Sequence, residues 1–283
     1  MQVTFWGVRG SIPSPGPATV RYGGNTSCVS ARLADGEIIM IDCGTGARNL
    51  GISLLASEFG KGKGSATVLL SHAHWDHIQG FPFFGPFYVP GNRFTIFGGS
   101  HGSELLERVL ERQMAAQFFP VQSYRNMGAQ IEMRAISENG EVRGGSARIT
   151  AHANPHGPTE VLAYRIEAGG KTLVYASDVG YGPEGAPPET VAAYRGADLL
   201  IHDCTFTPED RAQRMNRGLA SLDDAVNAAV RGEVKRLALF HYDQDYSDHD
   251  VDELVRRGRR QLDERGARHI EILGAAEGLT LTL

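Results

Sequence analysis

Four residues whose side chains bind metal ions follow an apolar run near position 70. The stretch VLLSHAHWDHIQGF places His72, His74, Asp76 and His77 within six positions. Residues two apart in an extended strand point to the same side, so the imidazoles of His72 and His74 can reach one ion about 2 Å away. Asp76 and His77 are adjacent, and they converge only where the chain turns into a helix. The spacing therefore predicts a pair of neighbouring cation sites.

Two closed sites need more ligands, and the sequence offers candidates where other strands end. Asp178 ends the apolar run of YASDVG before a glycine, and His241 occupies the same place in LALFHYD. The segment AHANPHGP adds His152 and His156 near the head of a β segment. Since one carboxylate can bridge two cations, we expect Asp178 to lie between the two sites.

Short apolar strands alternate with amphipathic helices along the chain. The run at 37–44 is predicted to be a strand that leads into a glycine turn, and the run at 66–72 a strand too apolar to be exposed on either face of a sheet. Further strands are predicted in QIEMRAI, SARITAHAN, VLAYRIEA, KTLVYASD, DLLIHD and RLALFHYD. Helices are predicted from Ser103, Thr207 and Ser221, the last two with capping residues. Two packed sheets with helices outside would bury all of these apolar strands.

The composition limits the function classes. The chain has 283 residues, of which 41% are hydrophobic and 22% charged, as in an ordinary globular protein with a substantial core. Its net charge of −5 argues against a nucleic-acid partner, which usually requires a basic face. No apolar run is long enough for a membrane span, and the N-terminus lacks the features of a signal peptide. Three scattered cysteines, Cys28, Cys43 and Cys204, suit a reducing compartment, so we expect a cytoplasmic protein.

The donor motif resembles that of a known superfamily. SHAHWDH is similar to the His-x-His-x-Asp-His motif of the metallo-β-lactamase superfamily, and its other motif positions fall in order at Asp42, His156, Asp178 and His241. GNTSC after RYG, GFPFFGP and LLIHDCTF resemble signatures of the ribonuclease Z and small-phosphodiesterase branch. The resemblance covers essentially the whole chain. It implies an α/β (α+β) fold, a four-layer αββα sandwich of two mixed β-sheets with helices outside, in one domain spanning residues 1–283.

The same resemblance implies a ligand for each metal position. The implied ligands of two divalent ions are His72, His74 and His156 for the first, Asp76, His77 and His241 for the second, and Asp178 as the bridge. HGP at His156 is similar to the HPG of that branch, so His156 is preferred to His152. Asp42 and His202 are expected to support the ligands from behind, where such residues fix the orientation and basicity of imidazoles.

A two-ion site of this kind implies hydrolysis. Water shared by the ions loses a proton near neutral pH, and the bridging hydroxide then attacks phosphorus or a carbonyl carbon. Nitrogen and oxygen donors without thiolate suit zinc and are compatible with manganese or iron. Asp76 is expected to act in catalysis as well as in metal binding. In the stretch HDCT, Asp203 takes the position of the ribonuclease acid that helps to protonate the leaving oxygen.

Two departures from ribonuclease Z distinguish this sequence. The histidine that would pair with the acid falls in RGLAS, where Leu219 or Ala220 stands instead. No basic arm with a Gly/Pro tip is inserted between Pro158 and Asp178 or after Asp203. Since phosphate contacts dominate nucleic-acid affinity, we expect a small phosphodiester substrate, including cyclic ones, rather than an RNA precursor.

Substrate-binding residues are predicted from a loop near the N-terminus. Arg9 and Arg21 flank a Gly/Pro-rich loop and Asn25 follows two glycines, and an arginine there could hold a phosphate in bidentate fashion. We expect these three residues to contact the substrate. Trp75 is expected to pack at a helix start. The aromatic residues of FPFFGPFY either line the pocket or belong to the core.

Other functions would use the same ions. A lactonase, an arylesterase or a weak β-lactamase would act on a carbonyl substrate, and a tRNA 3′-processing ribonuclease would act on RNA. A redox enzyme is a weaker alternative because no flavin domain is appended. A non-catalytic metal-binding protein is disfavoured because degenerate members usually lose ligands. Members of the family often dimerise, so a homodimer is a further alternative. No membrane partner is expected.

Overall fold

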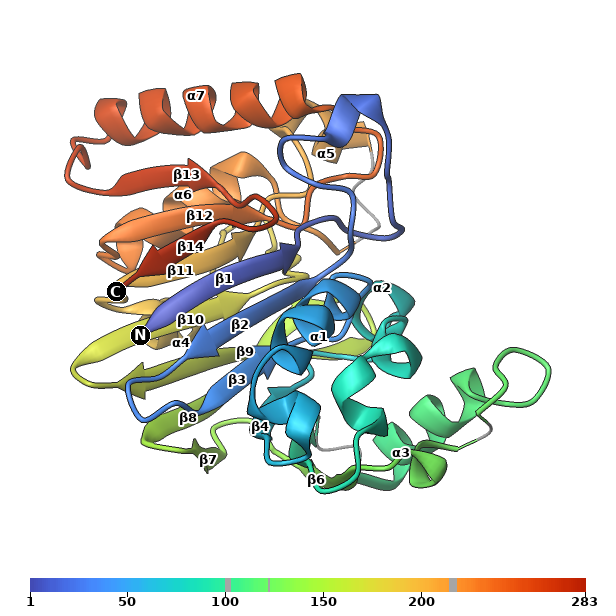
Figure 1. The fold of residues 1–283 in the computed structure, drawn as a ribbon. Helices are drawn as coiled ribbons and strands as arrows, with labels where there is room; N and C mark the ends of the chain where they lie inside the picture. Colours follow the sequence, from blue (N-terminus) through green and yellow to red (C-terminus); the bar gives the residue numbers. More distant parts are fainter. Residues whose placement is uncertain (100–102, 122, 214–217) are drawn as a thin grey trace.

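The apolar runs of the sequence form two β-sheets that pack face to face, with helices on both outer sides (Figure 1). The computed structural model describes residues 1–99, 103–121, 123–213 and 218–283. Its sheets have seven strands each, in the orders β14-β1-β2-β3-β4-β5-β6 and β13-β12-β11-β10-β9-β8-β7. Both sheets contain parallel and antiparallel pairs. The predicted sandwich of two mixed sheets is confirmed.

The first sheet is built from the N-terminal half of the chain together with the last strand, β14, and the second sheet from the strands between them. The strands of the first sheet are β1 (Gln2–Gly7), β2 (Cys28–Arg32), β3 (Ile38–Ile41), β4 (Ser65–Leu69), β5 (Arg93–Gly98), β6 (Gln130–Ala135) and β14 (Thr280–Thr282). Those of the second sheet are β7 (Glu141–Gly144), β8 (Ala147–His156), β9 (Thr159–Ala168), β10 (Lys171–Ala176), β11 (Leu199–Asp203), β12 (Arg236–Phe240) and β13 (Glu271–Gly274). The helices are α1 (Ala47–Leu55), α2 (Trp75–Ile78), α3 (Ser103–Gln113), α4 (Pro188–Tyr194), α5 (Pro208–Gln213), α6 (Leu222–Arg231) and α7 (Asp248–Glu264).

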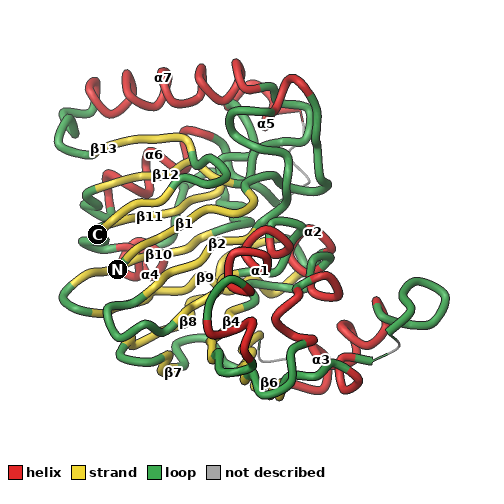
Figure 2. The backbone as a smooth tube through the Cα atoms, viewed as in Figure 1, coloured by secondary structure: helices red, strands yellow, loops and turns green. Residues whose placement is uncertain are grey.

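Two cores hold the layers together. The larger fills the space between the sheets, where Phe5 of β1, Ile41 of β3 and Tyr175 of β10 are fully buried, and it continues beneath α4, α6 and α7. The smaller lies on the outer face of the first sheet, and most of the FPFFGPFY aromatics enter it, with Phe81 and Phe87 fully buried. Each large apolar side chain buried in this way contributes about 1.5–3 kcal/mol to the free energy of unfolding. Figure 2 shows the strands enclosed between α7 on one side and α1 and α3 on the other.

The helices begin where the sequence places their capping residues. Ser221 and Asp224 form the predicted capping box of α6, and the Thr207 hydroxyl accepts the Asp210 N–H at the start of α5. A capping box that sequence analysis did not identify, Ser247 with Asp250, begins α7. Of the helices in the described ranges, none has the length and apolarity needed to cross a bilayer.

Strand direction brings distant polar residues to one edge of the sandwich. β3 and β4 run parallel, as do β10, β11 and β12, and β8 shares the direction of β10 because both are antiparallel to β9. The residues that follow these strands therefore lie at the same end of the molecule.

Candidate metal centre

The seven predicted ligands meet at this edge. They form two groups, within each of which all donor atoms lie within 4.8 Å of one another: His72, His74, His156 and Asp178 in one, and Asp76, His77 and His241 in the other. The first two histidines follow β4, and α2 begins at Trp75, so the chain turns into a helix where the adjacent donors require it. The convergence assembles the donors of two sites.

Asp178 lies between the two groups. Its Oδ2 is 3.0 Å from Nε2 of His77 and 3.2 Å from Nε2 of His241. Its Oδ1 is 3.9 Å from Nε2 of His72 and also from Nε2 of His156. Each carboxylate oxygen thus faces one group, which is the geometry that a bridging ligand needs.

Four of the five imidazoles are held through Nδ1, which leaves Nε2 directed to the centre. The Nδ1 partners are Ser71 Oγ for His72 at 3.1 Å, Asp42 Oδ2 for His77 at 2.7 Å, the Gly218 carbonyl for His156 at 2.7 Å, and Thr205 Oγ1 for His241 at 3.0 Å. Metal-binding histidines typically have such a partner on the second nitrogen. Nε2 of His72 is buried and has no hydrogen-bond partner among the described residues, so its lone pair fits a cation.

Asp42 supports the centre by gathering four donors on one fully buried carboxylate. Its Oδ1 accepts the Ser71 N–H at 2.7 Å, and its Oδ2 accepts the Ser71 hydroxyl at 2.8 Å and the Tyr175 hydroxyl at 2.6 Å. His77 Nδ1 completes the set. Since Tyr175 belongs to β10, this carboxylate ties the ligand loop of the first sheet to the second sheet.

Four residues at the site have an uncommon backbone conformation. Asp42, Asp178 and His241 each follow a strand with φ of 56°, 53° and 59°, and Ser11 in the N-terminal loop has φ of 66°. Positive φ is rare for residues other than glycine. Strained residues often concentrate at functional sites, and four of the six described non-glycine residues with positive φ lie here.

The N-terminal loop closes the second group. The Ser11 N–H donates to Oδ2 of Asp76 at 2.7 Å. A Cβ atom on Gly10 would lie 2.4 Å from the His241 ring, so only glycine permits this approach. The contacts of Ser11, Thr205 and Tyr175 with the site were not predicted, because nothing in the local sequence indicates which loop or strand will face the ligands.

Carboxylates control the charge of the centre. Burial would lower the pKa of His77, but Asp178, Asp76 and Asp42 raise it well above its ordinary value. Burial likewise opposes the charge of His241, yet Asp178 and Asp76 raise its pKa to about 9. Burial would raise the pKa of Asp178, but the charges of His241 and His77 hold it well below its usual range. The centre is therefore built to hold positive charge.

Asp203, predicted to take the position of the ribonuclease acid, has both carboxylate oxygens engaged by hydrogen bonds within the protein. Asp203 is fully buried. Its Oδ1 accepts the N–H and hydroxyl of Thr205, and its Oδ2 accepts the N–H groups of Val179 and Ala220. The Thr205 hydroxyl in turn contacts His241 Nδ1, so Asp203 acts on His241 through Thr205.

His202 lies further from the ligands than predicted. Its Nδ1 is 2.7 Å from the backbone oxygen of Asp203, and its Nε2 is 3.0 Å from the Tyr181 hydroxyl. Its imidazole thus supports the end of β11 and the Tyr181 side chain, and none of its hydrogen bonds in the described structure reaches a predicted ligand.

The three predicted substrate-binding residues are directed elsewhere. Arg9 is fully buried and donates to the carbonyls of Gly23 and Tyr246. Arg21 is bound to Asp252 of α7, and Asn25 donates to the Glu277 carboxylate. The structure therefore corrects these predictions. All three side chains hold the N-terminal loop to the rest of the protein, and their positions beside that loop in the sequence do not reveal this.

A hollow of about 320 Å³ opens over the two groups. Leu219 lines it, whereas Ala220 is fully buried, so of these two residues Leu219 is the one beside the donors. Arg217, which begins the segment RGLAS, lies outside the described residues. Trp75 also lines the hollow and is 77% exposed, so the prediction that it packs at the helix start is wrong.

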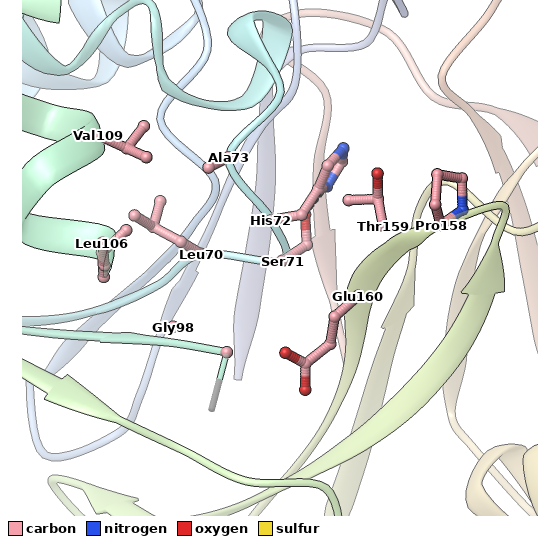
Figure 3. A pocket seen from close by; sticks show the side chains of 11 residues that line it. Leu70, Ser71, His72, Ala73, Gly98, Leu106, Val109, Pro158, Thr159 and Glu160 are labelled. Carbon is pink, nitrogen blue, oxygen red and sulfur yellow. Dashed lines mark hydrogen bonds between the residues drawn. The ribbon is translucent and has the colours of Figure 1, made fainter. Parts of the chain in front are cut away.

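A second hollow of about 220 Å³ adjoins His72 (Figure 3). Leu106 and Val109 of α3 form one wall, and the Glu160 carboxylate points from β9 toward Gly98. Of the predicted ligands, only His72 lines this second hollow.

The donor set fits two divalent cations. It contains imidazole nitrogens and carboxylate oxygens, one orphaned nitrogen and a carboxylate placed between two groups. His152 does not belong to either group, whereas His156 does. The three cysteines are buried and free, and neither group contains one.

Comparisons with known proteins agree with this architecture. A family model described as the Beta-lactamase superfamily domain matches residues 38–242. The chain is 28% identical to the ribonuclease Z of Natronomonas pharaonis, over 87% of this chain and 88% of that protein. It is 26% identical to the ribonuclease Z of Metallosphaera sedula, over 92% and 94%. The metallo-beta-lactamase fold protein YhfI from Bacillus subtilis has a similar structure, with a TM-score of 0.73, 21% identity, and coverage of 99% and 98%.

Metal addition is expected to stabilise the folded chain. Zinc added to chelator-treated protein should raise Tm by about 5 °C or more, because the donors converge only in the folded state. His74→Ala should reduce this gain while leaving the metal-free Tm unchanged, since His74 is exposed. Differential scanning calorimetry measures both, with the exposed His249→Ala as the matched control. An equal gain in His74→Ala and wild type would contradict the assigned ligand set.

Loss of the Asp42 carboxylate is expected to destabilise the protein even without metal. Asp42→Asn keeps the shape but turns one acceptor into a donor that faces donors, so the free energy of unfolding should fall by about 2 kcal/mol or more. Urea unfolding in the presence of chelator measures it. Asp263→Asn, on the exposed face of α7, should change it by less than about 0.5 kcal/mol. Equal effects of the two substitutions would show that Asp42 does not support the fold.

Proposed function

We propose that this chain, a metal-dependent hydrolase that belongs to the metallo-β-lactamase superfamily and its ribonuclease Z branch, hydrolyses small phosphodiesters with two divalent cations. The observation that carries the proposal is the position of Asp178, whose two oxygens face separate groups of imidazoles. Two-ion centres of this geometry are suited to in-line displacement at phosphorus, where attacking and leaving oxygens need stabilisation at the same time.

Zinc is the proposed metal, because the donors are imidazoles and carboxylates without thiolate. His72, His74 and His156 would hold one ion, Asp76, His77 and His241 the other, and Asp178 both. When bound, the ions lower the pKa of water and draw charge from the phosphoryl oxygens.

The protein's own residues orient these donors. The Thr205 hydroxyl donates its hydrogen to Asp203. The Thr205 oxygen can therefore accept the Nδ1–H of His241. This chain of hydrogen bonds fixes the tautomer whose Nε2 lone pair faces the centre. Asp42 sets the same tautomer in His77, and the Gly218 carbonyl sets it in His156. Asp76 is held in place by the Ser11 N–H.

The side chain over the centre supplies no proton. Leu219 lines the hollow, and Asp203 lies behind His241 with both oxygens occupied. This arrangement favours substrates whose leaving oxygen is stable without protonation or is stabilised by the ions directly. Activated and cyclic phosphodiesters meet this requirement.

A ribonuclease is the second candidate, favoured by relatives at 26–28% identity that are named ribonuclease Z. These names weigh against the expectation that nucleic acid is no partner. The fold offers little to grip RNA between Pro158 and Asp178, a fully described range in which β9 and β10 are joined by the turn Gly169–Gly170. The net charge of −5 also disfavours polyanion binding.

We further propose that residues 1–283 form one domain in a reducing, cytoplasmic location. The larger core draws residues from both sheets, so neither half buries its strands alone. The cysteines Cys28, Cys43 and Cys204 are unpaired.

The function is tested by elemental analysis of the purified protein together with a substrate panel. Bis(p-nitrophenyl) phosphate, a lactone, a cephalosporin and a precursor tRNA represent the competing classes. We expect metal-dependent turnover of the diester above all others. Preferred turnover of the lactone or the cephalosporin would replace the proposal with a carbonyl hydrolase, and cleavage of the tRNA 3′ end at low concentration would replace it with a ribonuclease.

Leaving-group dependence tests the role of Leu219. For aryl phosphodiesters of graded phenol pKa, wild-type kcat/KM should fall steeply as the phenol becomes a poorer leaving group. Leu219→His introduces a proton donor and should raise kcat/KM for the poorest leaving groups about tenfold or more. Leu219→Met keeps the volume without a proton and serves as the control. A flat dependence in the wild type would show that the leaving oxygen is already protonated by another group.

A further inference from the structure

A third hollow, of about 510 Å³, lies beside the metal centre. Trp75 and Ala73, from the ligand motif itself, form one side of it. Phe83, which follows α2, and Val109 and Phe118, from α3 and the segment after it, form the rest of its apolar wall. Figure 1 draws α3 and this segment at the edge of the molecule, beyond α2.

Exposed aromatic side chains gather in this hollow. Trp75 is 77% exposed, Phe83 59% and Phe118 77%, and they are the three Trp or Phe residues of the described chain with large exposed side chains. Phe119 packs edge-on against Phe83, with ring centroids 5.2 Å apart, so the segment after α3 is held against the FPFFGPFY turn. Apolar surface of this kind is usually buried in a globular protein unless it binds something.

Polar side chains line the hollow as well. Gln113 is one of them, and its Nε2 is buried within the protein. The exposed guanidinium of Arg112, on the same wall, can stack on a ring or pair with an anion.

Trp75 connects this hollow to the reacting site. Its side chain lines both the hollow over the metal ligands and the aromatic hollow, because it lies between His74 and Asp76. A substrate whose phosphorus lies at the metal centre therefore has a route for its organic group past Trp75. A protein partner would not need this connection.

From these observations we propose that the aromatic hollow is the subsite for a nucleobase carried by the phosphodiester substrate, stacked among Trp75, Phe83 and Phe118. The inference rests on the proposed function and narrows its substrate class to nucleotides. Any base can stack on an aromatic side chain, and the stacking is strong enough to favour nucleotides over phosphodiesters without a base.

Binding of two phosphates that differ only in the base tests the subsite. Isothermal titration of the zinc-loaded protein with adenosine 5′-monophosphate and with ribose 5-phosphate should show a preference for the nucleotide of about tenfold or more, the size of one base–aromatic stack. Phe118→Ala and Phe83→Ala should each reduce this ratio to about threefold or less. Ile52→Ala, an exposed apolar residue on α1, should leave it unchanged. Since Phe118 and Phe83 are exposed, both variants should keep the wild-type Tm.

Two results would overturn the subsite. A nucleotide preference unchanged in both phenylalanine variants would show that the base binds elsewhere or not at all. A wild-type dimer in light scattering that Phe118→Ala dissociates, without a change in the ratio, would show that a second copy of the chain covers this surface instead.

The same experiment separates the subsite from the proposed function. Hydrolysis of bis(p-nitrophenyl) phosphate without a nucleotide preference would remove the subsite and leave the phosphodiesterase. A nucleotide preference that depends on Phe118, without turnover of any diester, would remove the phosphodiesterase and leave a nucleotide-binding site.

Discussion

The buried carboxylate of Asp42 is the interaction on which the centre depends. A charge without solvent must be satisfied by hydrogen bonds, and Asp42 achieves this with the Ser71 N–H and hydroxyl, the Tyr175 hydroxyl and the His77 imidazole. These donors come from the ligand loop after β4 and from β10 of the opposite sheet. The Asp42 charge can be buried only when the two sheets are packed together and the ligand loop is in place. Folding of the sandwich therefore also positions the metal ligands.

Electrostatics then explains why this edge of the sandwich binds cations. Asp76 and Asp178 lie among imidazoles with little solvent to screen them, and they raise the pKa of His77 and His241. The positive charge that the carboxylates attract is supplied by protons in the absence of metal and by metal ions in their presence. His72, whose pKa is lowered well below its usual value mainly by burial, stays neutral and offers its lone pair.

The fold and the centre are shared across a superfamily that carries out many reactions, so substrate choice lies in what surrounds the ions. Three features define those surroundings here. The N-terminal loop closes on Asp76 through Ser11, Leu219 places an aliphatic side chain beside the metal donors, and α3 with its following segment leaves an aromatic hollow beside Trp75. Each is a loop or helix end attached to a rigid sheet edge, where sequence can change without loss of the core.

The sequence by itself determined the two sheets and the cluster of metal donors, because hydrophobic periodicity and the spacing within SHAHWDH are local signals. It also placed Asp178 and His241 at the ends of strands and His156 near the head of a β segment, and parallel strands bring such ends together. Only the tertiary structure decided which side chains face the centre and which turn away. Arg9 and Asn25 anchor loops inside the protein, Asp203 reaches His241 only through Thr205, and Trp75 is exposed rather than packed. These outcomes depend on contacts between residues far apart in the chain, such as Asn25 with Glu277, and no local pattern encodes such contacts.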